Sequence, residues 1–197
     1  MRALLALAAL ACLALAVVVT VLRSSEESGT GSVTVLGDSL NVGIEPYLEE
    51  ELGRWKISND YAVGRRTDEG VALLRALDEK LALVVVVSLG TNDPQTDVER
   101  FRAQVEQVLR IAGPKRCVVW STIWLDGPND AFNNVLRQAS DRHRNLEIED
   151  WSALIETRPE LLAADRVHGS PAGYARRAED VARIVRDCLP PAPERAP

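Results

Sequence analysis

Four short polar segments carry the residues that could perform chemistry: Gly37-Asp38-Ser39-Leu40, Ala62-Val63-Gly64-Arg65, Gly90-Thr91-Asn92-Asp93 and Asp165-Arg166-Val167-His168. A serine hydroxyl is a weak nucleophile, and it needs a neighbouring base, usually a histidine that is itself oriented by a carboxylate. Gly64 can bring its backbone N–H close to a reacting oxygen because it has no side chain. Asn92 can offer a side-chain N–H to the same oxygen. Together these groups are the parts that acyl transfer through a serine requires.

The histidine count narrows the choice of base, because the chain has only His143 and His168. His143 lies within the charged run 141–144, where we expect an exposed or helix-capping role. His168 follows Asp165 by three residues, just before a helix. One short turn could let Asp165 hold the imidazole in the tautomer that accepts a proton from Ser39. If Ser39 is a nucleophile, its base is therefore His168.

Apolar runs alternate with amphipathic segments along the chain. The pattern predicts strands at 33–36, 55–63, 81–89, 116–123 and 146–148, and helices at 41–52, 67–80, 98–111, 130–142 and 171–188. Such alternation is typical of a mostly parallel sheet with helices on both faces, here a three-layer α/β flavodoxin-like domain of five strands. Ligands bind beyond the carboxyl ends of such strands, so we expect the four polar segments to meet at one edge.

In this order the four segments resemble the blocks of the SGNH (GDSL-type) hydrolase superfamily, over a region from Val33 to about Cys188. The resemblance implies a Ser39–His168–Asp165 triad, and an oxyanion hole made of the Ser39 N–H, the Gly64 N–H and the Asn92 side chain. It implies ester hydrolysis or acyl transfer through an acyl-serine intermediate, with no metal and no cofactor.

A narrower similarity is carried by Val63-Gly64-Arg65 together with an exported, membrane-tethered domain. It resembles the SGNH domain of bacterial cell-wall O-acetyltransferases. Those domains are usually fused to a many-helix acyl-donor module, so a separate membrane protein would have to supply the acyl group here. Three functions therefore stay open: a carbohydrate- or lipid-ester hydrolase, an O-acyltransferase acting on cell-wall glycan, and a non-catalytic binding module of the same fold. Binding of FMN is disfavoured because no Ser/Thr-rich phosphate loop follows the first strand.

Two substrate contacts can be suggested, each with a structural alternative. Trp124, in the loop after the fourth strand, could line an acyl pocket or could be a half-buried packing residue. Arg65 and Arg66 flank the expected oxyanion hole, and they could contact an anionic glycan or lipid. Alternatively, the arginines belong to the solvated surface at a helix start.

The extreme N-terminus predicts a membrane anchor, because Ala3 to Leu22 is apolar except for Thr20. A helix of that length spans roughly 30 Å, the thickness of a bilayer core. We therefore expect a signal anchor at 1–23, a flexible tether at 24–32, the α/β domain at 33–188 and a Pro-rich tail at 189–197. Positive charge at Arg2 and the amino terminus predicts a cytoplasmic N-terminus and an outside domain, which would be secreted if the segment is cleaved. The net charge of −6 and the scattered arginines argue against a nucleic-acid partner.

Three cysteines are present, and Cys12 lies within the predicted span. Cys117 and Cys188 then form an even pair in an oxidising compartment. Cys117 opens a strand, and Cys188 ends a helix that runs back from the carboxyl edge of the sheet. Both should therefore lie on the side of the domain opposite the four segments. A disulfide is topologically feasible, but two free thiols are the equal alternative.

Overall fold

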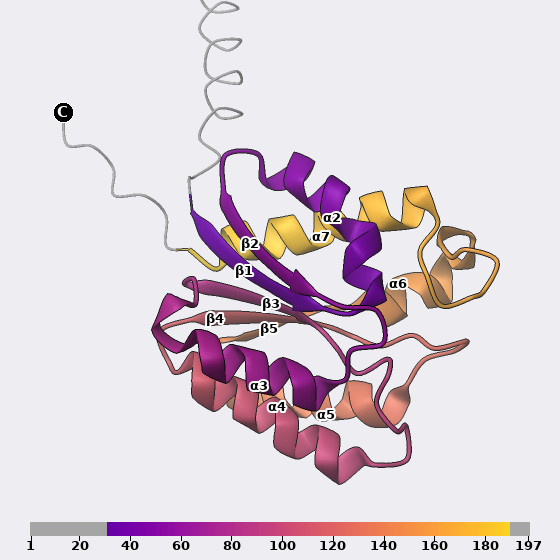
Figure 1. The fold of residues 1–197 in the computed structure, drawn as a ribbon. Helices are drawn as coiled ribbons and strands as arrows, with labels where there is room; N and C mark the ends of the chain where they lie inside the picture. The colour runs from indigo at the N-terminus through magenta and orange to yellow at the C-terminus, as the bar shows by residue number, and fades with distance from the viewer. Residues whose placement is uncertain (1–30, 190–197) are drawn as a thin grey trace, which may run out of the picture. The chain divides into compact units, whose positions relative to one another are not determined.

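A computed structural model describes residues 31–189 and shows a parallel sheet between two layers of helices (Figure 1). Its five strands lie in the order β2-β1-β3-β4-β5, which is the flavodoxin-like order. The strands are β1 (Ser32–Gly37), β2 (Lys56–Tyr61), β3 (Val84–Ser88), β4 (Cys117–Ser121) and β5 (Leu146–Glu149). The predicted fold class of the domain is thereby confirmed, and the carboxyl ends of all five strands share one edge.

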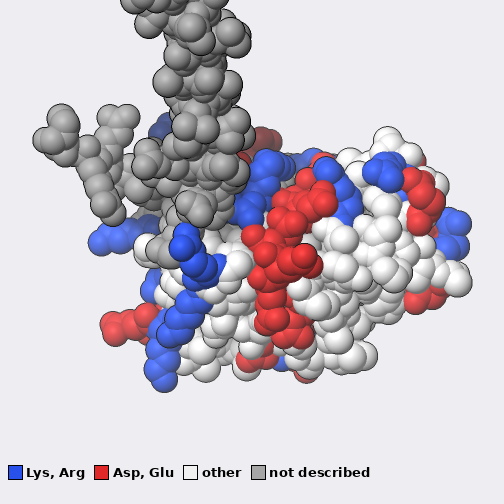
Figure 2. All heavy atoms as spheres, turned by 90° about the horizontal axis from the view of Figure 1, so that it is seen from above, with Lys and Arg blue, Asp and Glu red and all other residues white. Residues whose placement is uncertain are grey.

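Helices cover both faces of the sheet, which is why β3 consists of four buried valines followed by buried Ser88. One layer contains α2 (Ser39–Leu52) and α7 (Pro171–Asp187), and the other contains α3 (Thr67–Leu77), α4 (Val98–Ala112) and α5 (Asp130–Arg142). The remaining elements are α6 (Trp151–Thr157) and the 3₁₀ turns η1 (Asp78–Lys80) and η2 (Pro159–Leu161). Figure 2 looks onto the α2 side and shows acidic side chains in a band with basic side chains on either side of it.

Most element boundaries differ from the sequence prediction by one or two residues, and the larger differences lie at α3, β3 and α6. The predicted helix 67–80 ends earlier, because its last residues form η1, and the strand predicted at 81–89 contracts to β3. The prediction missed α6 entirely. Its signal was present, since Asp150 caps the helix by accepting the Ala153 N–H, and Trp151 and Ile155 are buried on the inner face at helical spacing.

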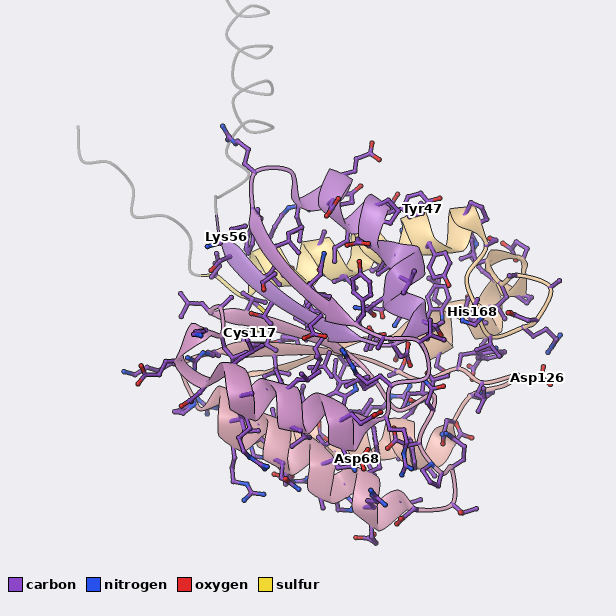
Figure 3. The ribbon with its side chains drawn as sticks, in the orientation of Figure 1. Tyr47, Lys56, Asp68, Cys117, Asp126 and His168 are labelled. Atoms are coloured by element: carbon purple, nitrogen blue, oxygen red, sulfur yellow. A yellow bond between two sulfur atoms is a disulfide. The ribbon has the colours of Figure 1, made fainter. Side chains whose placement is uncertain are left out.

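Cys117 and Cys188 form a disulfide, with their Cα atoms 5.9 Å apart. Figure 3 shows Cys117 at the end of the sheet opposite to His168, as the strand direction predicts. The bond closes a loop of 71 residues and stabilises the fold by roughly 4 kcal/mol in the chain-entropy description.

The predicted anchor, the tether up to residue 30 and the tail from residue 190 lie outside the described residues. Between residues 31 and 189, no helix is long and apolar enough to cross a membrane.

Candidate active site

Ser39 is the first residue of α2 and directly follows the turn that leaves β1. Asp38 forms the N-cap of this helix, where its Oδ1 accepts the Leu40 N–H at 3.0 Å. Burial raises the pKa of the Asp38 carboxyl, although the Leu40 N–H and the charge of Arg177 oppose that shift. The cap fixes the sharp strand-to-helix turn and presents the Ser39 hydroxyl at the carboxyl edge of the sheet.

The structure brings Ser39, His168 and Asp165 into one hydrogen-bonded line. Ser39 Oγ lies 2.9 Å from His168 Nε2, and His168 Nδ1 lies 2.8 Å from Asp165 Oδ2. The backbone N–H of His168, the N–H of Val167 and the His168 side chain together lower the pKa of Asp165 to about 2. An ionised carboxylate can only accept, so Nδ1 carries the proton and the Nε2 lone pair faces the Ser39 hydroxyl. This arrangement can deprotonate Ser39 during an attack on a carbonyl carbon.

Contacts from the loop after β4 hold the segment that carries His168. The Trp124 Nε1–H donates to the Arg166 carbonyl at 3.0 Å, and Arg166 forms an ion pair with Asp126. Arg166 has a φ of 62°, an unusual value for a residue with a side chain. Trp124 is only 7% exposed and packs with Trp151, Ile155 and Leu161. Trp124 thus has the packing contacts that the structural alternative proposed.

Gly64 and Asn92 lie in the loops after β2 and β3, on either side of the loop after β1. Gly64 has a φ of 77°, which explains why a residue without Cβ stands there. Asn92 Nδ2 donates to Asp38 Oδ2 at 2.9 Å and to the Arg65 carbonyl at 3.2 Å. Asp38 thus orients the Asn92 amide. The other Nδ2–H of Asn92, which donates to the Arg65 carbonyl in this structure, is the one that could donate to a substrate oxygen instead.

Arg65 differs from its sequence prediction because its guanidinium folds back onto the protein. Nη1 donates to the carbonyls of Asp60 and Gly37 at 2.7 and 3.2 Å, and Nη2 pairs with Asp60 Oδ1 at 2.7 Å. The Arg65 side chain is only 10% exposed, so its charge is not offered to an anionic substrate. Instead it ties the loop that carries Gly64 to the ends of β1 and β2. Arg66 caps α3, as the helix-start alternative proposed.

We expect Arg65→Ala to lower kcat for a neutral ester by about tenfold, a fraction of the loss that follows removal of a whole oxyanion donor. The reason is that the Gly64 loop loses three hydrogen bonds. KM for neutral and anionic p-nitrophenyl esters should change alike. Arg66→Ala is the matched control and should leave both constants unchanged. A rise in KM restricted to anionic esters would instead restore the substrate-contact interpretation.

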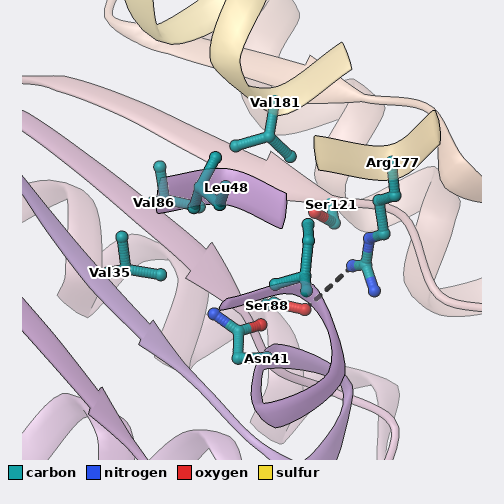
Figure 4. Close-up of a pocket in the computed structure, with 9 residues that line it drawn as sticks. Val35, Asn41, Leu48, Val86, Ser88, Ser121, Arg177 and Val181 are labelled. Carbon is teal, nitrogen blue, oxygen red and sulfur yellow. Dashed lines mark hydrogen bonds between the residues drawn. The ribbon is translucent and has the colours of Figure 1, made fainter. Parts of the chain in front are cut away.

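Sequence reasoning missed a buried ionic group beneath the site. Arg177 of α7 donates to Ser88 Oγ at 2.9 Å (Figure 4). Its guanidinium also pairs with Glu149 at 3.3 Å and lies over the face of Trp151. The signal was its place four residues before buried Val181, on the inner stripe of α7. The small adjoining cavity has a volume of about 10 Å³, room for one water rather than a substrate.

No protein-family model matches the sequence, and no curated protein matches it. Solved structures match its fold, each covering most of both chains. The catalytic domain of peptidoglycan O-acetyltransferase A from Streptococcus pneumoniae has a TM-score of 0.68 at 17% identity, covering 81% of this chain and 94% of that one. A GDSL-like lipase from Bacteroides thetaiotaomicron has a TM-score of 0.66 at 14% identity, covering 81% and 89%. A family 3 carbohydrate esterase from Clostridium thermocellum has a TM-score of 0.63 at 14% identity, covering 80% and 99%. This chain therefore has the fold of the SGNH, or GDSL-type, hydrolases.

Proposed function

We propose that this protein is an extracytoplasmic serine esterase that cleaves carbohydrate or lipid esters through an acyl-serine intermediate. The observation that carries the proposal is the line from Ser39 Oγ through the His168 imidazole to the Asp165 carboxylate. A module that only binds its ligand would have no need of a base aligned on a serine hydroxyl.

The chemistry follows from this geometry in two balanced steps. Ser39 Oγ attacks the ester carbonyl carbon while its proton passes to His168 Nε2, and the N–H groups of Ser39, Gly64 and Asn92 stabilise the oxyanion. His168 then gives that proton to the departing alkoxide, which leaves as an alcohol. Water repeats the attack on the acyl-serine, and it releases the acid and restores Ser39.

Transfer of the acyl group to a glycan is the second candidate, and the similarity to a peptidoglycan O-acetyltransferase domain favours it. The two reactions differ only in whether water or a sugar hydroxyl accepts the acyl group. A separate membrane protein would supply the acyl donor in that case.

The Cys117–Cys188 disulfide supports an extracytoplasmic location, because disulfides persist in oxidising compartments.

The test uses the purified full chain in detergent. A fluorophosphonate probe should form an adduct that peptide mass spectrometry locates on Ser39, and the chain should release acid from p-nitrophenyl acetate. Ser39→Ala should lose both. Adding an oligosaccharide acceptor separates the two candidates, because a transferase yields acylated sugar and an esterase yields only free acid. An unlabelled Ser39 would contradict both enzymatic candidates.

A further inference from the structure

An open groove with a volume of about 510 Å³ adjoins the candidate oxyanion hole. It lies between the loop after β2 and the first turns of α3, and it is lined by Ala62, Val63, Gly64, Arg65, Glu69, Ala72 and Leu73. Its volume is in the range of small-molecule sites. Gly64 belongs to both the groove and the oxyanion hole, so a molecule in the groove would reach the reacting carbonyl.

The exposed lining of the groove is more apolar than polar, and its apolar part is formed by Ala62, Val63, Ala72 and Leu73. The Arg65 guanidinium is bound to Gly37 and Asp60, and one Glu69 oxygen accepts the Arg66 N–H at 2.8 Å. Val63 is 80% exposed, which is an unusual solvent contact for a large aliphatic side chain. Such a surface gains stability when an apolar group covers it.

The sheet order places the groove and the base on opposite sides of Ser39. The loop after β2 flanks the loop after β1 on one side. On the other side, beyond β3, the loop after β4 holds the His168 segment through the Trp124–Arg166 hydrogen bond. The nucleophile therefore stands between the His168 segment and the groove.

Stereochemistry then assigns the two halves of an ester. The leaving oxygen must lie beside His168 Nε2, because that nitrogen returns the proton to it. The oxyanion points to the Gly64 and Asn92 donors, so the acyl substituent is left on the side remote from His168. Resting on the proposed function, we infer that the groove of Ala62–Leu73 binds the acyl part of the substrate and that this part is an aliphatic chain. The alcohol half lies on the β4 side, beside the charged pair Arg166–Asp126.

The experiment compares two ester series with the full chain in detergent. One series varies the acyl group from p-nitrophenyl acetate to the octanoate, and the other varies the alcohol of an acetate ester. In the wild type, kcat/KM should rise along the acyl series, by up to roughly fourfold per buried methylene. Ala72→Phe fills the groove at an exposed position of α3. It should lower kcat/KM for the octanoate by at least about tenfold and leave that for the acetate within about twofold.

The control is Leu83→Ser, at an exposed apolar residue just before β3, on the opposite edge of the sheet. It should leave the octanoate-to-acetate ratio unchanged. If Ala72→Phe leaves that ratio unchanged, or alters only the alcohol series, the inference is overturned.

Binding of octanamide, which has no ester bond, is measured by calorimetry in parallel. If Ala72→Phe binds octanamide more weakly than the wild type does, but the wild type hydrolyses no ester, the proposed function fails and the groove assignment stands. If acetate is hydrolysed but octanamide binding does not depend on Ala72, the groove assignment fails and the proposed function stands.

Discussion

Replacing His168 by alanine is expected to lower kcat for ester hydrolysis by roughly four to six orders of magnitude. His168 Nε2 lies 2.9 Å from Ser39 Oγ and is positioned both to take the serine proton and to return it to the leaving group. Without the imidazole the oxyanion donors remain, but the serine stays protonated. The release of p-nitrophenolate from p-nitrophenyl acetate would measure this decrease in kcat. Added free imidazole should restore part of kcat, because it can occupy the space that the side chain vacates.

His143→Ala is the matched control, since it removes the other histidine of the chain. His143 ends α5, and its Nε2 lies 3.1 Å from Glu106 Oε2 of α4. Its loss should leave kcat within about twofold, because a partly exposed pair of this kind contributes little to stability. Equal losses in the two variants would show that His168 acts through folding alone. Turnover unaffected by His168→Ala would contradict the triad.

The parts of the fold that the sequence predicted are those with strong local signals. The buried run of β3 and the amphipathic stripe of α5 determine their own secondary structure, and parallel strands place the loops that follow them at one edge. The scarcity of histidine then left His168 as the base. These signals are local in sequence, or depend on composition, and need no knowledge of packing.

The side-chain roles that could not be predicted depend on contacts between distant segments. Arg65 resembles a surface arginine in sequence, yet its guanidinium meets the carbonyls of Gly37 and Asp60 only when β1 and β2 pair. Trp124 meets Arg166 across 42 residues of chain. Spacing alone cannot reveal such partners, because the direction of each side chain is set by the assembled loops.

Replacing Arg177 by methionine is expected to destabilise the protein by about 3–5 kcal/mol, because it leaves a buried carboxylate without its partner. Arg177 and Glu149 have side chains that are each only 2% exposed. Arg177→Met with Glu149→Leu should recover most of the loss, since apolar residues of similar size can replace a buried ion pair. Urea unfolding followed by tryptophan fluorescence would report the change.

The destabilisation by Arg177→Met should also increase with pH. Burial raises the pKa of Glu149, and the charge of Arg177 opposes that rise. Without Arg177 the pKa in the folded state rises further above that of the unfolded chain. When the pKa of a carboxyl is raised in the folded state, the protein loses folding stability as the pH increases. The loss runs from the pKa of the unfolded chain, near 4.3, up to the pKa of the folded state. The deficit should therefore be larger at pH 8 than at pH 5.

Arg183→Met is the matched control on the same helix. Arg183 pairs with Asp187 at 3.5 Å, but both side chains are mostly exposed, so its replacement should change stability by less than about 1 kcal/mol at either pH. If Arg177→Met were no more destabilising than Arg183→Met, the buried pair would not support the sheet beneath Ser39. The same conclusion would follow if the double variant were less stable than Arg177→Met alone. We expect Arg177→Met to be the least stable of these variants, with its largest deficit at high pH. The cause is the unpaired Glu149 charge and not the loss of packing volume.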